Sequence, residues 1–319
     1  MPRSPANSTL GPLLHKLTQK LGDQQAKNEL RWMVDHVRTK LTHPAAHPTI
    51  HKAARVWRDQ PADKAERMRL TQVQWAWLRQ AVRDRAHDKP LQYILGKQAF
   101  GRATIFTRPP VLIPRWETEE WVLRLARMIG DSGEKALRVV DMCSGSGCVA
   151  LALKLELGGL VDVLGVDVSE AAVALALENR KANHAGGVRF KRLDLASREA
   201  CAELTKEGPW DMIVANPPYV TPQEYVELDP SVRDWEDKRA LVPDSDDPMG
   251  FIRRLAELAS EVSCHTLPSC LPRLVVEIGG SHQVEATQQA MHDNGLNATE
   301  VWKDMAGTDR VVLGYSKPK

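Results

Sequence analysis

The sequence predicts an α/β domain built on a mostly parallel β-sheet, preceded by a smaller helical domain. In residues 115–319, apolar segments of strand length alternate with amphipathic helical segments, which is typical of a parallel sheet covered by helices on both faces. The helical domain is expected at residues 1–88, because the sequence from about Leu13 to His87 shows helical periodicity and hardly any β-branched runs. Between them, residues 89–114 contain short alternating segments broken by glycine and proline, so we expect a β-hairpin linker there.

The composition excludes several classes of protein. With 319 residues, of which 43% are hydrophobic and 26% charged, the chain is long enough for two globular domains. A net charge of +2 is too small for a dedicated polyanion binder. Five cysteines without a CxxC pair predict neither a disulfide framework nor a metal site. No run approaches the roughly 18 apolar residues of a membrane span, so no membrane association is expected.

The helical domain contains four tryptophans, Trp32, Trp57, Trp75 and Trp77. Large aromatic side chains at helical spacing belong to a core or to a partner-facing surface, and we expect the core because such side chains are usually buried. Residues 1–22 contain basic and hydroxyl side chains but no acid, a weak feature of transit peptides. Taken alone, this composition fits an ordinary frayed terminus better.

Seven segments are the expected strands of the second domain: 136–143, 161–168, 188–195, 210–215, 273–279, 298–304 and 309–315. Helices are expected at 117–130, from Cys148, from Ser169, at 250–262 and at 281–294. The last two strands are separated only by a short "MAGT" stretch, which predicts an antiparallel hairpin at the edge of the sheet.

The first strand runs into a turn of small residues in the segment "VVDMCSGSGCVAL". Gly145 and Gly147 allow the backbone to turn tightly and to approach a ligand, while the helix that follows offers amide donors to an anionic group. However, "CSGSG" is neither a phosphate-binding GxxxxGK[ST] loop nor a complete GxGxxG. The turn by itself therefore fits a ligand cradle and plain packing equally well.

Acidic residues end the next two expected strands. Asp167 lies at the carboxyl end of the second strand, where a carboxylate can accept hydrogen bonds from both ribose hydroxyls of a nucleotide. Asp167 or Ser169 can equally cap the following helix, and the two roles are compatible. Asp194, at the end of the third strand, is placed to meet an adenine amino group, with helix capping as the alternative.

The motif Asn216-Pro217-Pro218-Tyr219 leaves the fourth strand at the edge where open α/β sheets bind their ligands. Because the prolines have no amide hydrogen, backbone carbonyls and the Asn216 side-chain oxygen can point into the cleft as acceptors. A planar NH₂ group fits them, and the ring of Tyr219 can stack on the group that carries it. The motif therefore predicts methylation of an amino or amide nitrogen, with a rigid turn as the structural alternative.

These segments resemble, as a set, the HemK/PrmC-type protein-(glutamine-N5) methyltransferases of peptide chain release factors. The resemblance runs from about Lys89 to Val312 and includes "PLQYILG", "VLIPRWETE", "VVEIG" and "DMAGTDRVV". "NPPY" alone also occurs in DNA adenine and RNA guanine methyltransferases, whereas its combination with "LIPRWETE" is much more specific. The resemblance implies the class I S-adenosylmethionine-dependent methyltransferase fold, with a mostly parallel seven-stranded sheet.

The resemblance also implies S-adenosylmethionine as the methyl donor and the glutamine of a Gly-Gly-Gln loop, in a class I release factor, as the acceptor. The helical domain, residues 1–88, would recognise that protein. The glutamine amide would be held by Asn216, Pro217, Pro218 and Tyr219, with Arg115, Glu117 and Thr118 on the substrate side. The cofactor would be held by Asp141, Cys143, Ser144, Gly145, Ser146, Gly147, Asp167, Val168, Asp194, Leu195 and Asn216.

Some features depart from the family pattern. Cys143 stands at the usual first glycine of the cofactor turn, and we expect its β-carbon to exclude a positive φ there. The segment 240–251, "ALVPDSDDPMGF", replaces a glycine-rich stretch on the substrate side. "IPRWETE" can also be explained as a proline-started helix with acids in its first turn. The long helical domain, the tryptophans of "PRWETEEW" and the acid-poor start resemble fungal mitochondrial members, so a mitochondrial location is predicted, with the cytoplasm as the alternative.

Two competing functions are compatible with parts of the pattern. A methyltransferase of DNA or RNA bases would need base flipping and a surface that grips phosphates, yet the sequence has no sustained basic strip. A non-catalytic scaffold would have no use for an intact "NPPY" motif or for Asp167. The sequence therefore predicts an enzyme that acts on a protein, without a nucleic-acid substrate.

Overall fold

The computed structural model describes residues 9–42, 70–243, 247, 249–262, 267 and 270–316. It divides into two compact units, Met1–Lys97 and Gln98–Lys319. The boundary falls inside strand β1 (Lys97–Phe100), within the segment expected to be a linker. Trp57 and the first eight residues of the basic terminus lie outside the described residues.

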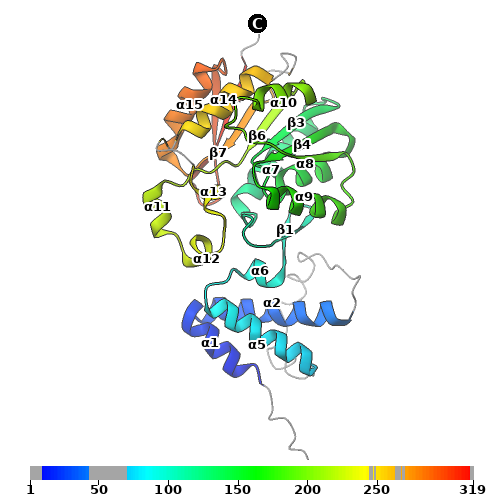
Figure 1. The fold of residues 1–319 in the computed structure, drawn as a ribbon, viewed down its shortest axis with the longest axis vertical. Coiled ribbons are helices and arrows are strands. Elements are labelled where there is room, and N and C mark those ends of the chain that lie inside the picture. The colour runs from blue at the N-terminus through cyan, green and yellow to red at the C-terminus, as the bar shows by residue number, and fades with distance from the viewer. Residues whose placement is uncertain are drawn as a thin grey trace, which may run out of the picture. The chain divides into compact units, whose positions relative to one another are not determined.

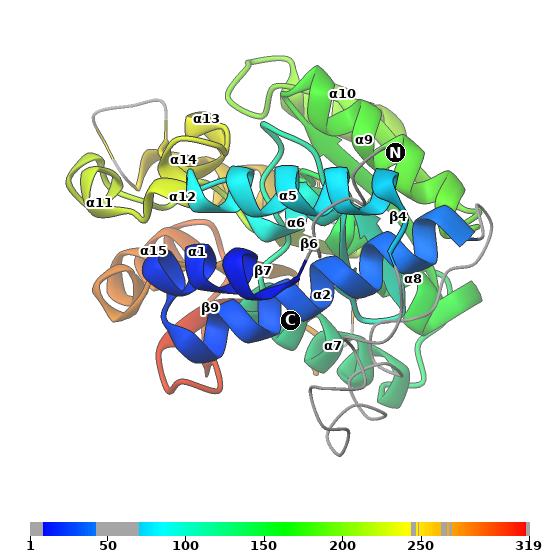
Figure 2. The ribbon, with the colours of Figure 1, turned by 90° about the horizontal axis from the view of Figure 1, so that it is seen from below.

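The N-terminal unit contains α1 (Gly11–Leu21), α2 (Asp23–Thr42) and α5 (Gln72–Ala86), which pack against one another (Figure 2). Aliphatic side chains, including Leu17, Met33 and Leu78, fill the centre of this unit. Helix α5 begins at a capping box, in which Thr71 accepts from the amide of Gln74 and the Gln74 side chain accepts from the amide of Thr71. The described part of the expected helical domain therefore consists of helices and the short segments that join them.

The tryptophans of this unit do not form its core. Trp75 and Trp77 are only partly buried against the aliphatic cluster, and the ring of Trp77 stacks on His36 at 5.2 Å. The expectation of a core position is wrong for Trp32, which is 44% exposed. The physical reason is that the described helices of this unit enclose a narrow space, which alanine, leucine, valine and methionine already fill.

The segment between the helical unit and the sheet begins with a helix, α6 (Leu91–Leu95), where the sequence suggested an extended linker. Pro90 stands at its N-cap and Gly96 at its C-cap, in the left-handed region with φ of 71°. Strands β1 and β2 (Ala103–Phe106) then form a separate two-stranded sheet. The hairpin is thus shorter than the β-hairpin linker expected at residues 89–114.

The second unit is built on a seven-stranded sheet with the order β5-β4-β3-β6-β7-β9-β8 (Figure 1). Neighbours among the first five strands pair in parallel, whereas β9 pairs antiparallel with β7 and with the edge strand β8. The bounds are β3 (Leu137–Met142), β4 (Val161–Asp167), β5 (Val188–Arg192), β6 (Met212–Ala215), β7 (Leu274–Glu277), β8 (Ala298–Lys303) and β9 (Asp309–Tyr315). This confirms the predicted mostly parallel sheet and its C-terminal hairpin.

Helices cover both faces of the sheet, because successive strand residues alternate between two apolar cores (Figure 1). On β3, for example, Val139 belongs to one core and Val140 to the other. The first core includes residues of α7 (Trp116–Asp131) and α8 (Cys148–Leu157), and α9 (Glu170–Ala182) packs beside them on β4 and β5. The second includes residues of α10 (Ala200–Glu207), α14 (Gly250–Val262) and α15 (Val284–Asp293).

Three short helices follow β6 that the sequence pattern did not predict: α11 (Pro222–Glu227), α12 (Pro230–Arg233) and α13 (Lys238–Leu241). Each starts at a side-chain cap, supplied by Thr221, Asp229 and Asp237. They lie in the connection from β6 to α14, which starts at the edge of the sheet where β6 ends. The segment 240–251, which departs from the family pattern, is described only in part: residues 244–246 and 248 lie outside the described residues.

Two 3₁₀ turns complete the second unit, η1 (Gly158–Leu160) and η2 (Ser281–Gln283). None of the helices in the described residues combines the length and the apolar character that a membrane span requires.

Candidate active site

The turn between β3 and α8 is fixed to the neighbouring strand. The amide of Ser144 donates to the carbonyl of Val166 on β4 at 2.9 Å, and the amide of Gly147 donates to the carbonyl of Ser144 at 2.7 Å. Asn179 on α9 holds the turn from behind by donating to the carbonyl of Ser146 at 3.0 Å. The backbone path of the turn is therefore set before any ligand binds.

Cys143 departs from the sequence-based expectation, because it adopts a φ of +66°. A β-carbon disfavours this left-handed conformation but does not forbid it when neighbouring hydrogen bonds fix the chain, as the bond from Ser144 to Val166 does here. The expectation that cysteine excludes a positive φ is therefore wrong. Burial raises the pKa of the Cys143 thiol well above its usual value, so the thiol stays neutral.

The glycines of the turn have different roles. A β-carbon on Gly147 would lie 2.7 Å from the ring of Phe190, and one on Gly165 of β4 would lie 2.5 Å from the same ring. These two glycines are required for packing. Gly145, with φ of +53°, has no atom within 4 Å of the position of an added β-carbon. Its backbone therefore faces open space, where a ligand can approach closely.

Asp141, at the end of β3, is buried with one carboxylate oxygen unsatisfied. Oδ2 accepts from the amide of Ala150 at 3.1 Å, whereas Oδ1 has no hydrogen-bond partner among the described residues. Burial, more than the nearby charge of Asp167, raises the pKa of Asp141 to about 8. A buried, unpartnered carboxylate oxygen is a favourable site for a cationic group.

Asp167, at the end of β4, connects the turn to the next helix. Its Oδ2 accepts from the amide of Gly145 at 2.8 Å, and its Oδ1 accepts from the amide of Ser169 at 2.9 Å. Capping of α9 falls to Ser169, whose hydroxyl accepts from Ala172. Burial raises the pKa of Asp167, and the two backbone amides oppose that rise. Val168, next in the chain, is 43% exposed.

Asp194 lies beyond the strand at whose end it was expected, because β5 stops at Arg192. It is exposed, and its Oδ1 accepts from the amide of Ala196 at 3.0 Å in a tight turn. The N-cap of α10 is Glu199, so Asp194 does not cap that helix. Leu195 is buried, and its carbonyl accepts from Arg254 on α14 at 3.2 Å.

The motif that follows β6 joins a buried hydrogen-bond network centred on Glu277, the last residue of β7. Nδ2 of Asn216 donates to the hydroxyl of Thr118 at 3.1 Å, and that hydroxyl donates to Oε2 of Glu277 at 2.7 Å. Trp121 Nε1 donates to the same oxygen at 2.7 Å. Tyr219 Oη donates to Oε1 of Glu277 at 3.1 Å. Residues from α7, the motif and β7 thus share one carboxylate.

The backbone of the motif is held as well. Gln283 donates through Nε2 to the carbonyl of Tyr219 at 2.8 Å and accepts through Oε1 from the amide of Gly279 at 2.8 Å. Burial and the charge of Glu277 raise the pKa of Tyr219, so the phenol remains a neutral donor. In the described part of the chain, no group donates to Oδ1 of Asn216 or to the carbonyl of Pro217.

The three residues expected on the substrate side lie in different surroundings. Thr118 is part of the network around Glu277. Arg115 donates to both carboxylate oxygens of Glu236 at 2.8 Å, which fastens the segment before α13 to the start of α7. Burial raises the pKa of Glu236, and its pairing with Arg115 opposes that rise.

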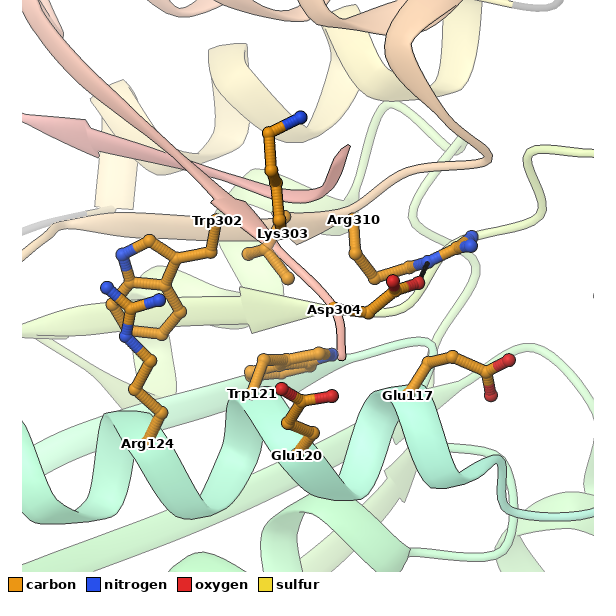
Figure 3. A pocket seen from close by; sticks show the side chains of 9 residues that line it. Glu117, Glu120, Trp121, Arg124, Trp302, Lys303, Asp304 and Arg310 are labelled. Atoms are coloured by element: carbon orange, nitrogen blue, oxygen red, sulfur yellow. Dashed lines mark hydrogen bonds and ion pairs between the residues drawn. The ribbon is translucent and has the colours of Figure 1, made fainter. Parts of the chain in front are cut away.

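Glu117 lines a pocket between α7 and the β8–β9 hairpin (Figure 3). In this pocket the guanidinium of Arg124 lies 3.8 Å from the ring centre of Trp302. Arg310 pairs with Asp304 and donates to the carbonyl of Ile278, so the wall of the pocket adjoins the end of β7. Its full lining is Glu117, Glu120, Trp121, Arg124, Trp302, Lys303, Asp304, Arg310 and Val311.

Three members of this site were not predicted from the sequence: Glu277, Trp121 and Gln283. A signal for the first was present, because a single carboxylate closes the otherwise apolar run "RLVVEIG". Such a group is costly to bury without donors, so its position at a strand end marks a polar network. Trp121 and Gln283 carry no comparable local signal.

Comparison with known proteins places the chain in a family. The sequence profile described as "Methyltransferase small domain" matches residues 125–228. The "Release factor glutamine methyltransferase" of Thermodesulfovibrio yellowstonii is 35% identical over 251 residues, which is 78% of this chain and 84% of that protein. The chain belongs to the release factor glutamine methyltransferase family. This confirms the predicted family and the prediction of an enzyme.

Eukaryotic relatives extend the match. The "Probable MRF1 mitochondrial N(5)-glutamine methyltransferase mtq1" of Schizosaccharomyces pombe is 32% identical over 237 residues, covering 72% of this chain and 76% of that protein. The human "MTRF1L release factor glutamine methyltransferase" is 30% identical over 304 residues, covering 92% and 82%. The match to the human relative therefore covers nearly the whole of this chain, including its helical unit.

Solved structures agree on the fold. The catalytic domain of human METTL16, solved with an RNA hairpin, superposes with a TM-score of 0.52 at 14% identity, covering 84% of this chain and 92% of that one. At this identity the likeness concerns the fold alone. It supports the class I methyltransferase architecture predicted for residues 115–319.

Proposed function

We propose that this methyltransferase transfers a methyl group from S-adenosylmethionine to the side-chain amide nitrogen of the glutamine in the Gly-Gly-Gln loop of a class I peptide chain release factor. The observation that carries the proposal is the hydrogen bond from Nδ2 of Asn216 to Thr118. It turns the donor side of the Asn216 amide toward the protein and leaves Oδ1 as an acceptor. An acceptor at this place suits a substrate NH₂ group.

The described residues fit S-adenosylmethionine. Oδ1 of Asp141 is buried without a donor, which suits the ammonium of the methionine part, and the open space before Gly145 admits that part to the backbone. Asp167 lies at the end of β4, where its carboxylate would accept from the ribose hydroxyls. Val168 and Leu195 would contact the adenine. When bound, the cofactor supplies an electrophilic methyl group.

The acceptor nitrogen of a glutamine is a poor nucleophile because its lone pair is delocalised into the carbonyl. Oδ1 of Asn216 and the carbonyl of Pro217 would accept hydrogen bonds from its two N–H groups, which raises its electron density and fixes its direction. The ring of Tyr219, held at its hydroxyl and at its backbone carbonyl, would cover the amide plane. No strong base is needed, since the nitrogen becomes acidic as it acquires positive charge.

Recognition of the whole release factor would fall to the N-terminal helical unit, Met1–Lys97, which has its own aliphatic core. Within the described helices Trp32 and Val73 are the large apolar side chains that remain exposed there, and they are candidates for contact with the protein substrate. A mitochondrial location is proposed because two fungal relatives are named as mitochondrial enzymes, and the match to one of them, at 27% identity, covers 97% of this chain.

The proposed function is tested by incubating the chain with methyl-labelled S-adenosylmethionine and, separately, a release factor, DNA and RNA. We expect label on the release factor, and peptide mass spectrometry should place the added methyl group on the glutamine of the Gly-Gly-Gln loop. A release factor with that glutamine changed to alanine serves as the matched control and should remain unlabelled. Label on DNA or RNA, or on another residue, contradicts the proposal.

A further inference from the structure

We infer that Glu277 is a positioning residue, which sets the orientation of the Asn216 amide through Thr118 and the place of the Tyr219 ring by direct contact. The inference rests on the proposed function, since it concerns how the site presents acceptors to the glutamine. Glu277 itself is 1% exposed and lies behind the motif, so it acts through other residues.

Stability alone does not account for a carboxylate at this place. Glu277 ends an apolar strand, and burial raises its pKa, which reflects the unfavourable free energy of charging a group away from water. Three donors compensate for that burial, from Thr118, Trp121 and Tyr219. Apolar side chains of the same volume in place of both the carboxylate and its donors would often be equally or more stabilising. What an apolar side chain lacks is the ability to give its neighbours a fixed direction of hydrogen bonding.

The direction of each hydrogen bond follows from the carboxylate. An ionised carboxylate only accepts, so the Thr118 hydroxyl must donate its single hydrogen to Glu277. The lone pairs of that hydroxyl then accept, and only the NH₂ side of Asn216 can donate to them. Oδ1 of Asn216 must therefore point away from Thr118, as an acceptor.

Without the carboxylate, this order is lost. The Thr118 hydroxyl would be free to turn its hydrogen toward Asn216, and the amide could then flip so that its oxygen faces Thr118. A flipped Asn216 would present NH₂ to the substrate NH₂, with two donors facing each other. The single charge of Glu277 thus selects one of two amide orientations that have nearly the same shape.

The same carboxylate holds the second part of the motif. Tyr219 donates to Oε1 while Thr118 and Trp121 donate to Oε2, so the two oxygens serve opposite sides of the site. Arg310 lies near enough for its charge to oppose the rise in the pKa of Glu277. The orientation of the acceptor and the place of the aromatic ring therefore depend on one buried group.

The test measures single-turnover methyl transfer to a release factor at saturating cofactor. Thr118→Val removes the hydroxyl at nearly constant shape. We expect the rate to fall about 10²-fold, which is the loss that a misplaced reacting group typically causes. Thr118→Ser restores a hydroxyl and should recover most of the rate. Glu277→Gln should also lose activity, because an amide cannot accept from all three donors. Calorimetric affinity for S-adenosylmethionine should stay the same in all three.

Ser132→Ala is the matched control, because it deletes a hydroxyl from the other end of the same helix, where Ser132 donates to the carbonyl of Ile129 and accepts from the amide of Glu134, both close in the chain. Its rate should equal that of the wild type. A double-mutant cycle separates positioning from a general structural effect. In an Asn216→Ala background, Thr118→Val should cause no further loss in rate, because no amide remains to be oriented.

The inference would be overturned if Thr118→Val lowered the rate by the same factor in the wild type and in the Asn216→Ala background. It would also be overturned if Thr118→Val and Glu277→Gln both kept the wild-type rate. Either result leaves the proposed function intact, provided that the wild-type chain methylates the glutamine. A wild-type chain that transfers no methyl group to the release factor overturns the proposed function and this inference together.

Discussion

Oδ2 of Asp167 accepts a hydrogen bond from the backbone amide of Gly145 at 2.8 Å. Asp167 ends β4 and Gly145 belongs to the turn after β3, so this bond joins two parts of the candidate site that adjacent parallel strands bring together. The proposed ribose site and the proposed methionine site therefore share one carboxylate.

Asp167→Ala should weaken binding of S-adenosylmethionine by about 1.5–3 kcal/mol, the range for hydrogen bonds to a charged group. Calorimetric titration measures the change. Asp162→Ala is the control, because Asp162 lies on the same strand but at its other end, in a surface ion pair with Arg189. Equal affinities of Asp167→Ala and the wild type, with the fold intact, would place the ribose elsewhere.

Asp141 should make cofactor binding depend on pH. Its pKa is raised to about 8 in the free protein, so at pH 7 the carboxyl is mostly protonated and must ionise to pair with an ammonium. Affinity should therefore rise between about pH 6 and pH 8 and level off above that range, with one proton released on binding at low pH.

Asp141→Asn provides the reference for this test, because the amide cannot ionise while the titration of the cofactor itself is unchanged. The difference between the pH profiles of cofactor affinity for the wild type and Asp141→Asn gives the contribution of Asp141. Profiles that run parallel over the whole range would show that Asp141 does not change its charge on binding.

Two glycines of the turn should respond differently to the same substitution. In Gly147→Ala the new β-carbon would meet the ring of Phe190 at 2.7 Å, at a φ of +81°, so we expect the free energy of unfolding to fall by about 1–3 kcal/mol. Gly145→Ala meets no atom and should cost less stability, but it should weaken cofactor binding. Urea titration and calorimetry measure the two effects, and a reversed order would contradict these roles.

Asn216→Ala should reduce methyl transfer by about 10²–10³-fold, or about 3–4 kcal/mol of barrier, because one preorganised acceptor is lost. Cofactor affinity should be mostly retained. Asn216→Asp keeps an acceptor of nearly the same shape and should retain more activity than alanine. Single-turnover rates of methyl transfer to a release factor compare the two variants with the wild type, and the release factor with its glutamine changed to alanine serves as the blank. Turnover near wild type in Asn216→Ala would refute the mechanism.

Deletion of residues 1–88 should leave cofactor affinity unchanged and raise the KM for a whole release factor, because the residues proposed to hold the cofactor all lie in the unit Gln98–Lys319. A short peptide containing Gly-Gly-Gln is the control substrate, and both chains should methylate it at similar rates. If the truncated chain methylates the whole factor as efficiently as the intact chain, the helical unit does not recognise the substrate.

Much of the fold is readable from local patterns. Apolar runs alternating with amphipathic segments predict the seven strands and the main helices, since each pattern reflects which faces of a single element are buried. The same pattern places Asp141, Asp167 and Asn216 at strand ends, and in a parallel sheet such ends gather at one edge. The gathering of these three residues at one edge of the sheet was therefore predictable without tertiary information.

Local patterns failed where neighbouring segments decide the conformation. Cys143 adopts a positive φ because Ser144 is bonded to Val166 on another strand, and this bond offsets the preference of an L-residue. Helix α6 forms where an apolar run resembled a strand, because Pro90 and Gly96 bound a single turn. The exposure of Trp32 likewise depends on which side chains fill the small core.

The sequence by itself determined the family, the sheet and the residues at the strand ends of the candidate site, because these depend on the order and periodicity of neighbouring residues. Only the tertiary structure joined Asn216 to Thr118 and Thr118 to Glu277, across 98 and 159 positions of the chain. The physical reason is that a hydrogen bond requires two groups within about 3 Å, and no local pattern states which distant segments come that close.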